Sequence, residues 1–103
     1  MIKVSVMYPN STDAKFDVEY YCNIHFPMVG ELLGESLKGR SADSGLVGGA
    51  PGEIAPFIAM GHMIFDSVDS FQNAFAPHAE KIMGDIPNFT NTQPQIQISE
   101  IKV

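Results

Sequence analysis

The chain has 103 residues, of which 45% are hydrophobic and 17% are charged, and its formal net charge is −6. This composition is typical of a single globular domain covering residues 1–103, and the acidic balance argues against a nucleic-acid-binding surface, because few basic side chains are present to neutralise phosphates. No apolar run approaches the ~20 residues of a membrane span and the N-terminus lacks the apolar segment of a signal peptide, so we expect a cytoplasmic protein that binds neither nucleic acid nor membrane.

The first predicted elements are a strand and a helix. In Met1 to Tyr8, apolar residues alternate with more polar ones, which is the period of a strand with one buried face. A helix is predicted from Phe16 to Leu33 or Leu37, with Asp17 as its N-cap. Gly34 is a candidate for its C-terminal end.

One side of this helix is apolar but contains a histidine next to a proline. Pro27 removes a backbone N–H and crowds the carbonyl of Asn23, so we expect a kink or a loosened turn. His25 is expected to be buried there, either as a proton-handling group or as an ordinary core histidine bonded to the freed carbonyl. Cys22, the only cysteine, is expected to be a small buried hydrophobe. Helical steps of three and four place on this side Val18, Cys22, His25, Val29 and Leu32/Leu33.

The middle of the chain contains two predicted strands joined by a loop. Ser36 to Leu46 is predicted to be a weak edge strand, and the glycine- and proline-rich segment Gly45 to Pro56 is predicted to be a loop. Phe57 to Phe65 is apolar almost throughout, which indicates a central strand buried on both faces. Its His62 is interpreted either as a ligand contact or as a core or interface residue.

The second half of the chain begins with another helix. Asp66-Ser67 is predicted to cap Ser67 to Phe75, and Pro77 is predicted to end this helix. A short helical piece, Pro77 to Met83, is expected to stop at Gly84.

A turn-rich loop and a last strand complete the chain. Asp85 to Pro94 is expected to be the loop, with Phe89 anchoring it to the body of the domain. Gln95 to Val103 is predicted to be a strand, and the slip of its apolar phase between Ile98 and Ile101 predicts a bulge.

The order strand, helix, strand, strand, helix, strand predicts an α+β ferredoxin-like βαββαβ sandwich with an antiparallel sheet. Both helices would cover one face of the sheet. The other face is too apolar to remain in contact with water, which predicts a homodimer packed face to face.

Several motifs resemble the EthD-like family, which is named for a protein of ethyl tert-butyl ether breakdown. They are Phe16-Asp17 with Tyr20-Tyr21, then His25-Phe26-Pro27, Phe65-Asp66-Ser67, and the run from Met83 to Thr90 that contains Asp85 and Phe89. The resemblance implies a dimeric α+β barrel, usually without an organic cofactor. Similar barrels include isomerases, cyclases, dehydratases and cofactor-free oxygenases, and some members are accessory proteins.

The resemblance also implies site residues. His25, Pro27, Asp85 and Phe89 match the family motifs, and His78 is placed similarly to the acid/base histidine of related polyketide cyclases. Gln72 stands where those cyclases have a tyrosine, which counts against a cyclase. The expected catalytic residues are therefore His25 and His78. The expected substrate-binding residues are Tyr21, Phe26, Pro27, His62, Asp85 and Phe89.

Three functions remain open from the sequence. The first is a cofactor-independent enzyme that transfers protons on a small apolar or aromatic molecule. The second is a non-catalytic accessory or ligand-binding dimer, and the third is a haem-binding or oxygenase barrel. No metal, haem or flavin is expected, because the three histidines lack metal-ligand spacing and no nucleotide motif occurs.

Overall fold

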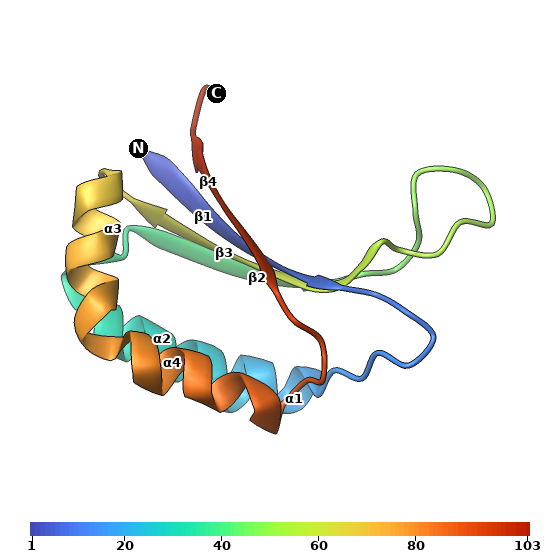
Figure 1. The fold of residues 1–103 in the computed structure, drawn as a ribbon. Helices are drawn as coiled ribbons and strands as arrows, with labels where there is room; N and C mark the ends of the chain where they lie inside the picture. Colours follow the sequence, from blue (N-terminus) through green and yellow to red (C-terminus); the bar gives the residue numbers. More distant parts are fainter.

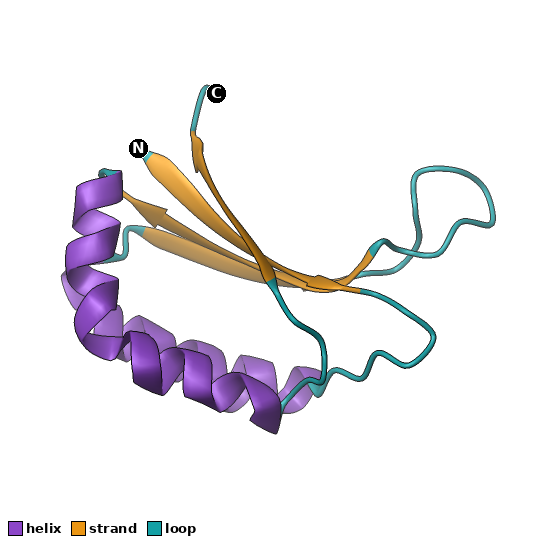
Figure 2. Cartoon of the chain, viewed as in Figure 1, coloured by secondary structure: helices purple, strands orange, loops and turns teal.

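The computed structural model describes residues 1–103. One antiparallel sheet contains four strands in the order β2-β3-β1-β4, and all the helices lie on one side of it (Figures 1 and 2). The ferredoxin-like α+β fold is therefore confirmed. The strands are β1 (Ile2–Pro9), β2 (Gly39–Ser44), β3 (Phe57–Phe65) and β4 (Gln95–Glu100).

The first helical segment is divided by a wide turn. Helix α1 (Val18–Tyr20) continues into a π-helical turn (Tyr21–His25), which is followed by α2 (Phe26–Leu33). The Asp17 side chain accepts a hydrogen bond from the Tyr20 N–H at 3.0 Å, as an N-cap does. The predicted loosening next to the proline is confirmed, and Gly34 ends α2 with a positive φ of 60°.

The π-helical turn changes which residues face the sheet. The buried residues follow one another in steps of four: Tyr21, His25, Val29 and Leu33. Val18 and Cys22 are exposed, so their predicted burial is wrong. A π turn contains more residues than an α turn, since its hydrogen bonds span five residues. Each residue therefore rotates less about the helix axis, and this brings residues four apart into line.

The second helical segment contains α3 (Val68–Phe75) and α4 (Ala79–Asp85), joined by a single 3₁₀ turn at Ala76–His78. Ser67 caps α3 as predicted, because its hydroxyl accepts from the Ser70 N–H at 3.0 Å. The predicted stop at Gly84 is wrong. A helical glycine costs only about 1 kcal/mol, and Ile82 and Ile86 on either side of it are buried. Asp85 is therefore the last residue of α4 and not part of a loop.

Two predictions about the sheet are confirmed, namely that β3 is central and that β2 is an edge strand. Only one face of β3 is buried within the chain, whereas the sequence predicted two. On the other face, Ile58, Met60, His62 and Ile64 are partly exposed. The predicted bulge in β4 is wrong, because its register with β1 is continuous up to the pair Ile2 and Glu100. Beyond this pair, the Ile101 N–H still donates a hydrogen bond to the Met1 carbonyl at 3.1 Å.

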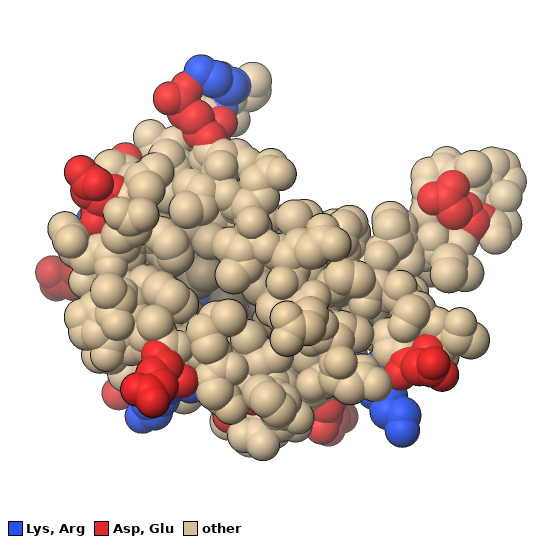
Figure 3. Space-filling view, in the orientation of Figure 1, with Lys and Arg blue, Asp and Glu red and all other residues tan.

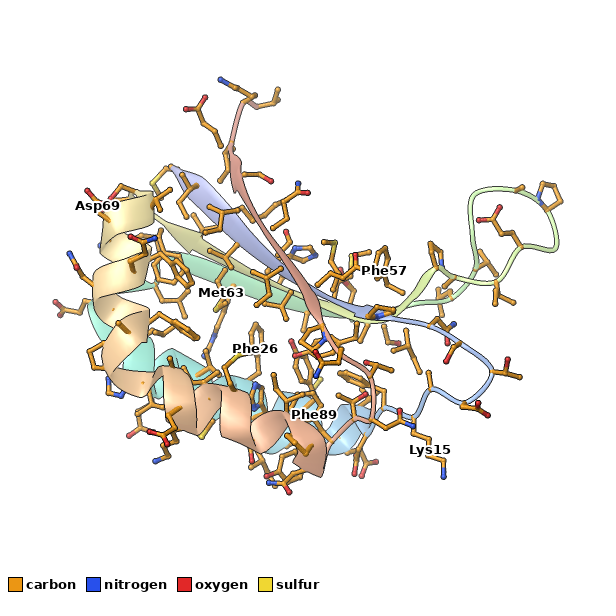
Figure 4. All side chains as sticks on the ribbon, in the orientation of Figure 1. Lys15, Phe26, Phe57, Met63, Asp69 and Phe89 are labelled. Carbon is orange, nitrogen blue, oxygen red and sulfur yellow. The ribbon has the colours of Figure 1, made fainter.

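The core lies between the helices and the sheet and has a mainly aliphatic part, which also contains Phe65, and an aromatic part. Phe26 and Met63 point toward one another across this space (Figure 4). The aromatic part contains Tyr8, Tyr21 and Phe89, together with Ala59 and Ile86.

The loop at residues 45–56 projects from one end of the sheet (Figure 1). No helix combines the length and the apolar character that crossing a membrane requires.

Candidate functional site

His25 lies on the π-helical turn and contacts the second helical segment. Its Nδ1 is 2.9 Å from Oδ2 of Asp85, the last residue of α4. The expected bond from His25 to the carbonyl of Asn23 is therefore wrong. The continuation of α4 through Gly84 explains the difference, because it carries the carboxylate to the histidine.

The Asp85 carboxylate accepts three hydrogen bonds. Besides the bond from His25, its Oδ1 accepts one from the Tyr20 hydroxyl at 2.7 Å and one from the Asn88 amide at 2.9 Å. Burial alone would raise the pKa of Asp85, but the bonds from Asn88, His25 and Tyr20 outweigh it and lower the pKa. The bond to Asp85 in turn raises the pKa of Tyr20. The carboxylate is therefore ionised at neutral pH.

The state of the histidine follows from its burial. Only 4% of His25 is exposed, and burial lowers its pKa more than the hydrogen bond and charge of Asp85 raise it. The imidazole is therefore neutral near pH 7. Since an ionised carboxylate can only accept, Nδ1 carries the proton and Nε2 has a free lone pair.

Aromatic rings fix the orientation of this imidazole. The Tyr21 ring stacks on it at a centroid distance of 5.6 Å and an angle of 19°, and the Phe89 ring lies 4.6 Å away. Phe89 is 3% exposed, which confirms its predicted role as an anchor. The histidine ring is therefore held both by its hydrogen bond and by its neighbours.

A cavity of about 270 Å³ lies between the helices and the sheet next to this histidine. Its walls are almost entirely apolar, and His25 is the only imidazole or carboxylate group among them. Charged side chains lie around the rim of the face shown in Figure 3, which is otherwise uncharged. The residues that line the cavity include Tyr8, Tyr21, His25, Phe26 and Gly61.

The second ring nitrogen of His25 faces accessible space. The only side-chain hydrogen bond of His25 is made by Nδ1. No side-chain nitrogen or oxygen that is fully buried lacks a hydrogen-bond partner. Nε2 must therefore retain accessible surface. Since His25 lines the cavity, we infer that this surface lies there.

The structure brings most of the predicted site residues together and separates three of them. Tyr21, Phe26, Asp85 and Phe89 surround His25 or line the cavity with it. His78 is not among the residues that line the cavity, and Pro27 lines a separate, more polar surface hollow. His62 is on the opposite face of the sheet, where its Nδ1 is 3.1 Å from the Ser5 hydroxyl oxygen.

Four residues of the site were missed in the sequence. Tyr8 belongs to the predicted apolar face of β1, where nothing in the sequence indicates a functional role. Gly61 interrupts an apolar strand, and a glycine in such a position is a known signal of close approach by another group. Tyr20 and Asn88 lie within motifs but have no individual signal of their role. No three His, Cys, Asp or Glu side chains are grouped as a metal site would require.

Comparisons with known proteins agree with the fold. The family model of the EthD domain matches residues 9–93. An EthD-like protein from Ralstonia eutropha JMP134 is 44% identical, with a TM-score of 0.95 over 99% of this chain and 92% of that chain. No curated protein matches.

Two more distant structures share the fold alone. An ethyl tert-butyl ether D (EthD) family protein from Bacillus halodurans C-125 is 22% identical, with a TM-score of 0.76 over 99% of both chains. HapK from Hahella chejuensis is 8% identical, with a TM-score of 0.60 over 99% of this chain and 93% of that chain.

Proposed function

This chain belongs to the EthD family, and we propose that its cavity binds a small apolar or aromatic molecule on which His25 acts as a proton-transferring base without a cofactor. The observation that supports this most is the bond from His25 Nδ1 to Asp85 Oδ2 at 2.9 Å. It leaves Nε2, the basic nitrogen, on the side of the cavity.

The two residues have different roles in this proposal. A general base must be unprotonated and held in a fixed geometry, and the neutral imidazole of His25, which is bonded to Asp85 and stacked on Tyr21, fulfils both conditions. Asp85 holds the ring in the tautomer with Nε2 unprotonated and stabilises the imidazolium after proton uptake. Isomerisation, dehydration and cyclisation are the reaction classes that one such base can support.

The test begins with the ligand. Native mass spectrometry of the purified protein should detect a bound small molecule, and NMR in D₂O should show exchange of its protons catalysed by the protein. We expect His25→Gln to abolish this exchange while the fold is retained, because glutamine can keep a hydrogen bond to Asp85 but cannot take up the proton. Asn23→Gln, an exposed change on the same turn, is the matched control. Exchange that survives His25→Gln would refute the proposed base.

The second candidate function is ligand binding without catalysis, as in an accessory protein. It is favoured by the position of His78, which does not line the cavity, so the second proton-handling group expected there is missing. If this alternative holds, the His25→Gln protein would bind the same ligand as the unaltered protein. The unaltered protein would catalyse no exchange of the ligand's protons in D₂O.

We further propose that two copies pack through the open faces of their sheets. This proposal is supported by Ile58, Met60 and Ile64, three large apolar side chains that remain partly exposed on the sheet face without helices. A second copy is the simplest partner for such a face.

A further inference from the structure

Two buried tyrosines meet at the wall of the cavity next to His25. Tyr8 comes from β1 and Tyr21 from the π-helical turn, and their rings are 5.8 Å apart in an edge-to-face arrangement. Both line the cavity. Burial raises the pKa of both hydroxyl groups, and their proximity raises that of Tyr8 further. Both are therefore protonated hydrogen-bond donors at neutral pH.

Gly61 on the central strand β3 leaves the space that the Tyr21 hydroxyl occupies. A Cβ atom at Gly61 would be 2.1 Å from the Tyr21 oxygen, which is far closer than a contact allows. Only glycine therefore permits the tyrosine to reach this position on β3. A phenylalanine at position 21 would not need that space, so the fit of Gly61 concerns the hydroxyl itself.

The Tyr21 hydroxyl has an interaction with Tyr8 but no protein acceptor for its own proton. The edge-to-face contact brings the two hydroxyl groups close enough to affect each other's pKa. Neither the Tyr8 nor the Tyr21 hydroxyl oxygen is both fully buried and without a hydrogen-bond partner. The Tyr21 proton is thus available to a molecule in the cavity, beside the stacked imidazole of His25 at 5.6 Å.

We propose that the cavity takes a carbonyl compound whose oxygen accepts a hydrogen bond from Tyr21, while His25 removes a proton from the neighbouring carbon. This inference rests on the proposed function and names its substrate class. The electron pair of the broken C–H bond forms a C=C bond, and the carbonyl π pair moves to the oxygen, giving an enolate. If the carbonyl compound is β,γ-unsaturated, this enolate is a dienolate, and return of the proton from His25 to its γ-carbon re-forms the C=O bond and leaves an α,β C=C bond, which completes an isomerisation without any co-reactant.

Physical chemistry favours this assignment. A negative charge that develops on oxygen in an apolar cavity needs fixed donors, and these are more effective there than in water. Tyr8 adds a second protonated hydroxyl group to the same wall of the cavity. The positive charge that develops on His25 is matched by Asp85, so both charges of the enolate state are compensated.

The test uses 4-nitrophenol as a stable mimic of the enolate. Nitrobenzene is the matched probe, because it lacks only the phenolic hydroxyl group. Absorption distinguishes the phenol from the phenolate. The unaltered protein should bind both probes, with 4-nitrophenol more tightly and as the phenolate. Tyr21→Phe should weaken 4-nitrophenol binding about 10- to 100-fold, as expected for a hydrogen bond to a charged group, and leave nitrobenzene binding unchanged.

Gly61→Ala provides a second variant, because its methyl group displaces the hydroxyl without removing it. It should reduce 4-nitrophenol binding, and combining it with Tyr21→Phe should cause little further loss. Equal binding of 4-nitrophenol by Tyr21→Phe and by the unaltered protein would overturn the inference. If nitrobenzene still binds in that case, the apolar ligand site stands and only the carbonyl assignment fails. If neither probe binds the unaltered protein, both proposals fail.

Discussion

Removal of the Asp85 carboxylate is the sharpest test of the site. Asp85→Ala takes an acceptor away from His25, Tyr20 and Asn88 at once. Asn88 is exposed and Tyr20 is partly exposed, so water can replace the bonds of both. His25 is 4% exposed and has no such substitute. The cost therefore comes mainly from one unsatisfied buried N–H, about 1–3 kcal/mol.

Thermal melts at pH 7 and fixed protein concentration measure this cost. For a domain of this size, each kcal/mol lowers Tm by about 4–8 °C. Asn88→Ala is the control, because it removes only an exposed donor to the same carboxylate. NMR titration should also show the pKa of His25 falling further in Asp85→Ala, since the carboxylate is what raises it against burial. Equal melting temperatures for Asp85→Ala and Asn88→Ala, or a rise in the pKa of His25, would refute the reasoning.

Three further predictions can be checked on the same protein. The free energy of unfolding should fall as the pH drops below about 6.5, the ordinary pKa of histidine. The reason is that the folded state holds the pKa of His25 lower, so the unfolded chain takes up the proton first. Urea unfolding at a series of pH values measures this, and His25→Gln should make the dependence flatter below about pH 6.5. Light scattering at micromolar concentration should give the mass of a dimer, and a monomer would contradict face-to-face packing. Cys22 is exposed, so a thiol reagent should label one cysteine per chain under native conditions, and labelling that requires denaturant would contradict its position.

Local signals explain what the sequence predicted correctly. The caps at Asp17 and Ser67 and the end of α2 at Gly34 all depend on residues close to one another in the chain. The order of the elements then leaves few topologies, because helices must cover the apolar face of the sheet.

The errors arise where the backbone departs from a regular period. The stripe through Val18 and Cys22 is correct for an ideal α-helix, but the π-helical turn brings Tyr21 inward in their place, while His25 is buried as predicted. The sequence showed a disturbance next to Pro27 and not its type. Gly84 was read as a break because its local propensity was considered without the packing of Ile82 and Ile86.

The composition of the candidate site was partly predictable, and its geometry was not. The family resemblance indicated both His25 and Asp85, but their hydrogen bond joins residues 60 positions apart. It depends on how the two helical segments lie against each other. The same dependence explains why His78, which is similar in placement to a known acid/base residue, is absent from the cavity wall.

The hydrogen bond between His25 and Asp85 also bears on how the domain folds. It connects the first helical segment with the end of the second, and neither segment can satisfy it alone. A partly folded chain with only the first segment docked would bury an imidazole N–H without an acceptor, which is unfavourable. The bond therefore penalises intermediates in which one segment has docked without the other, and it makes docking of the two segments more cooperative. Native-state hydrogen exchange should then show α2 and α4 opening together as one unit.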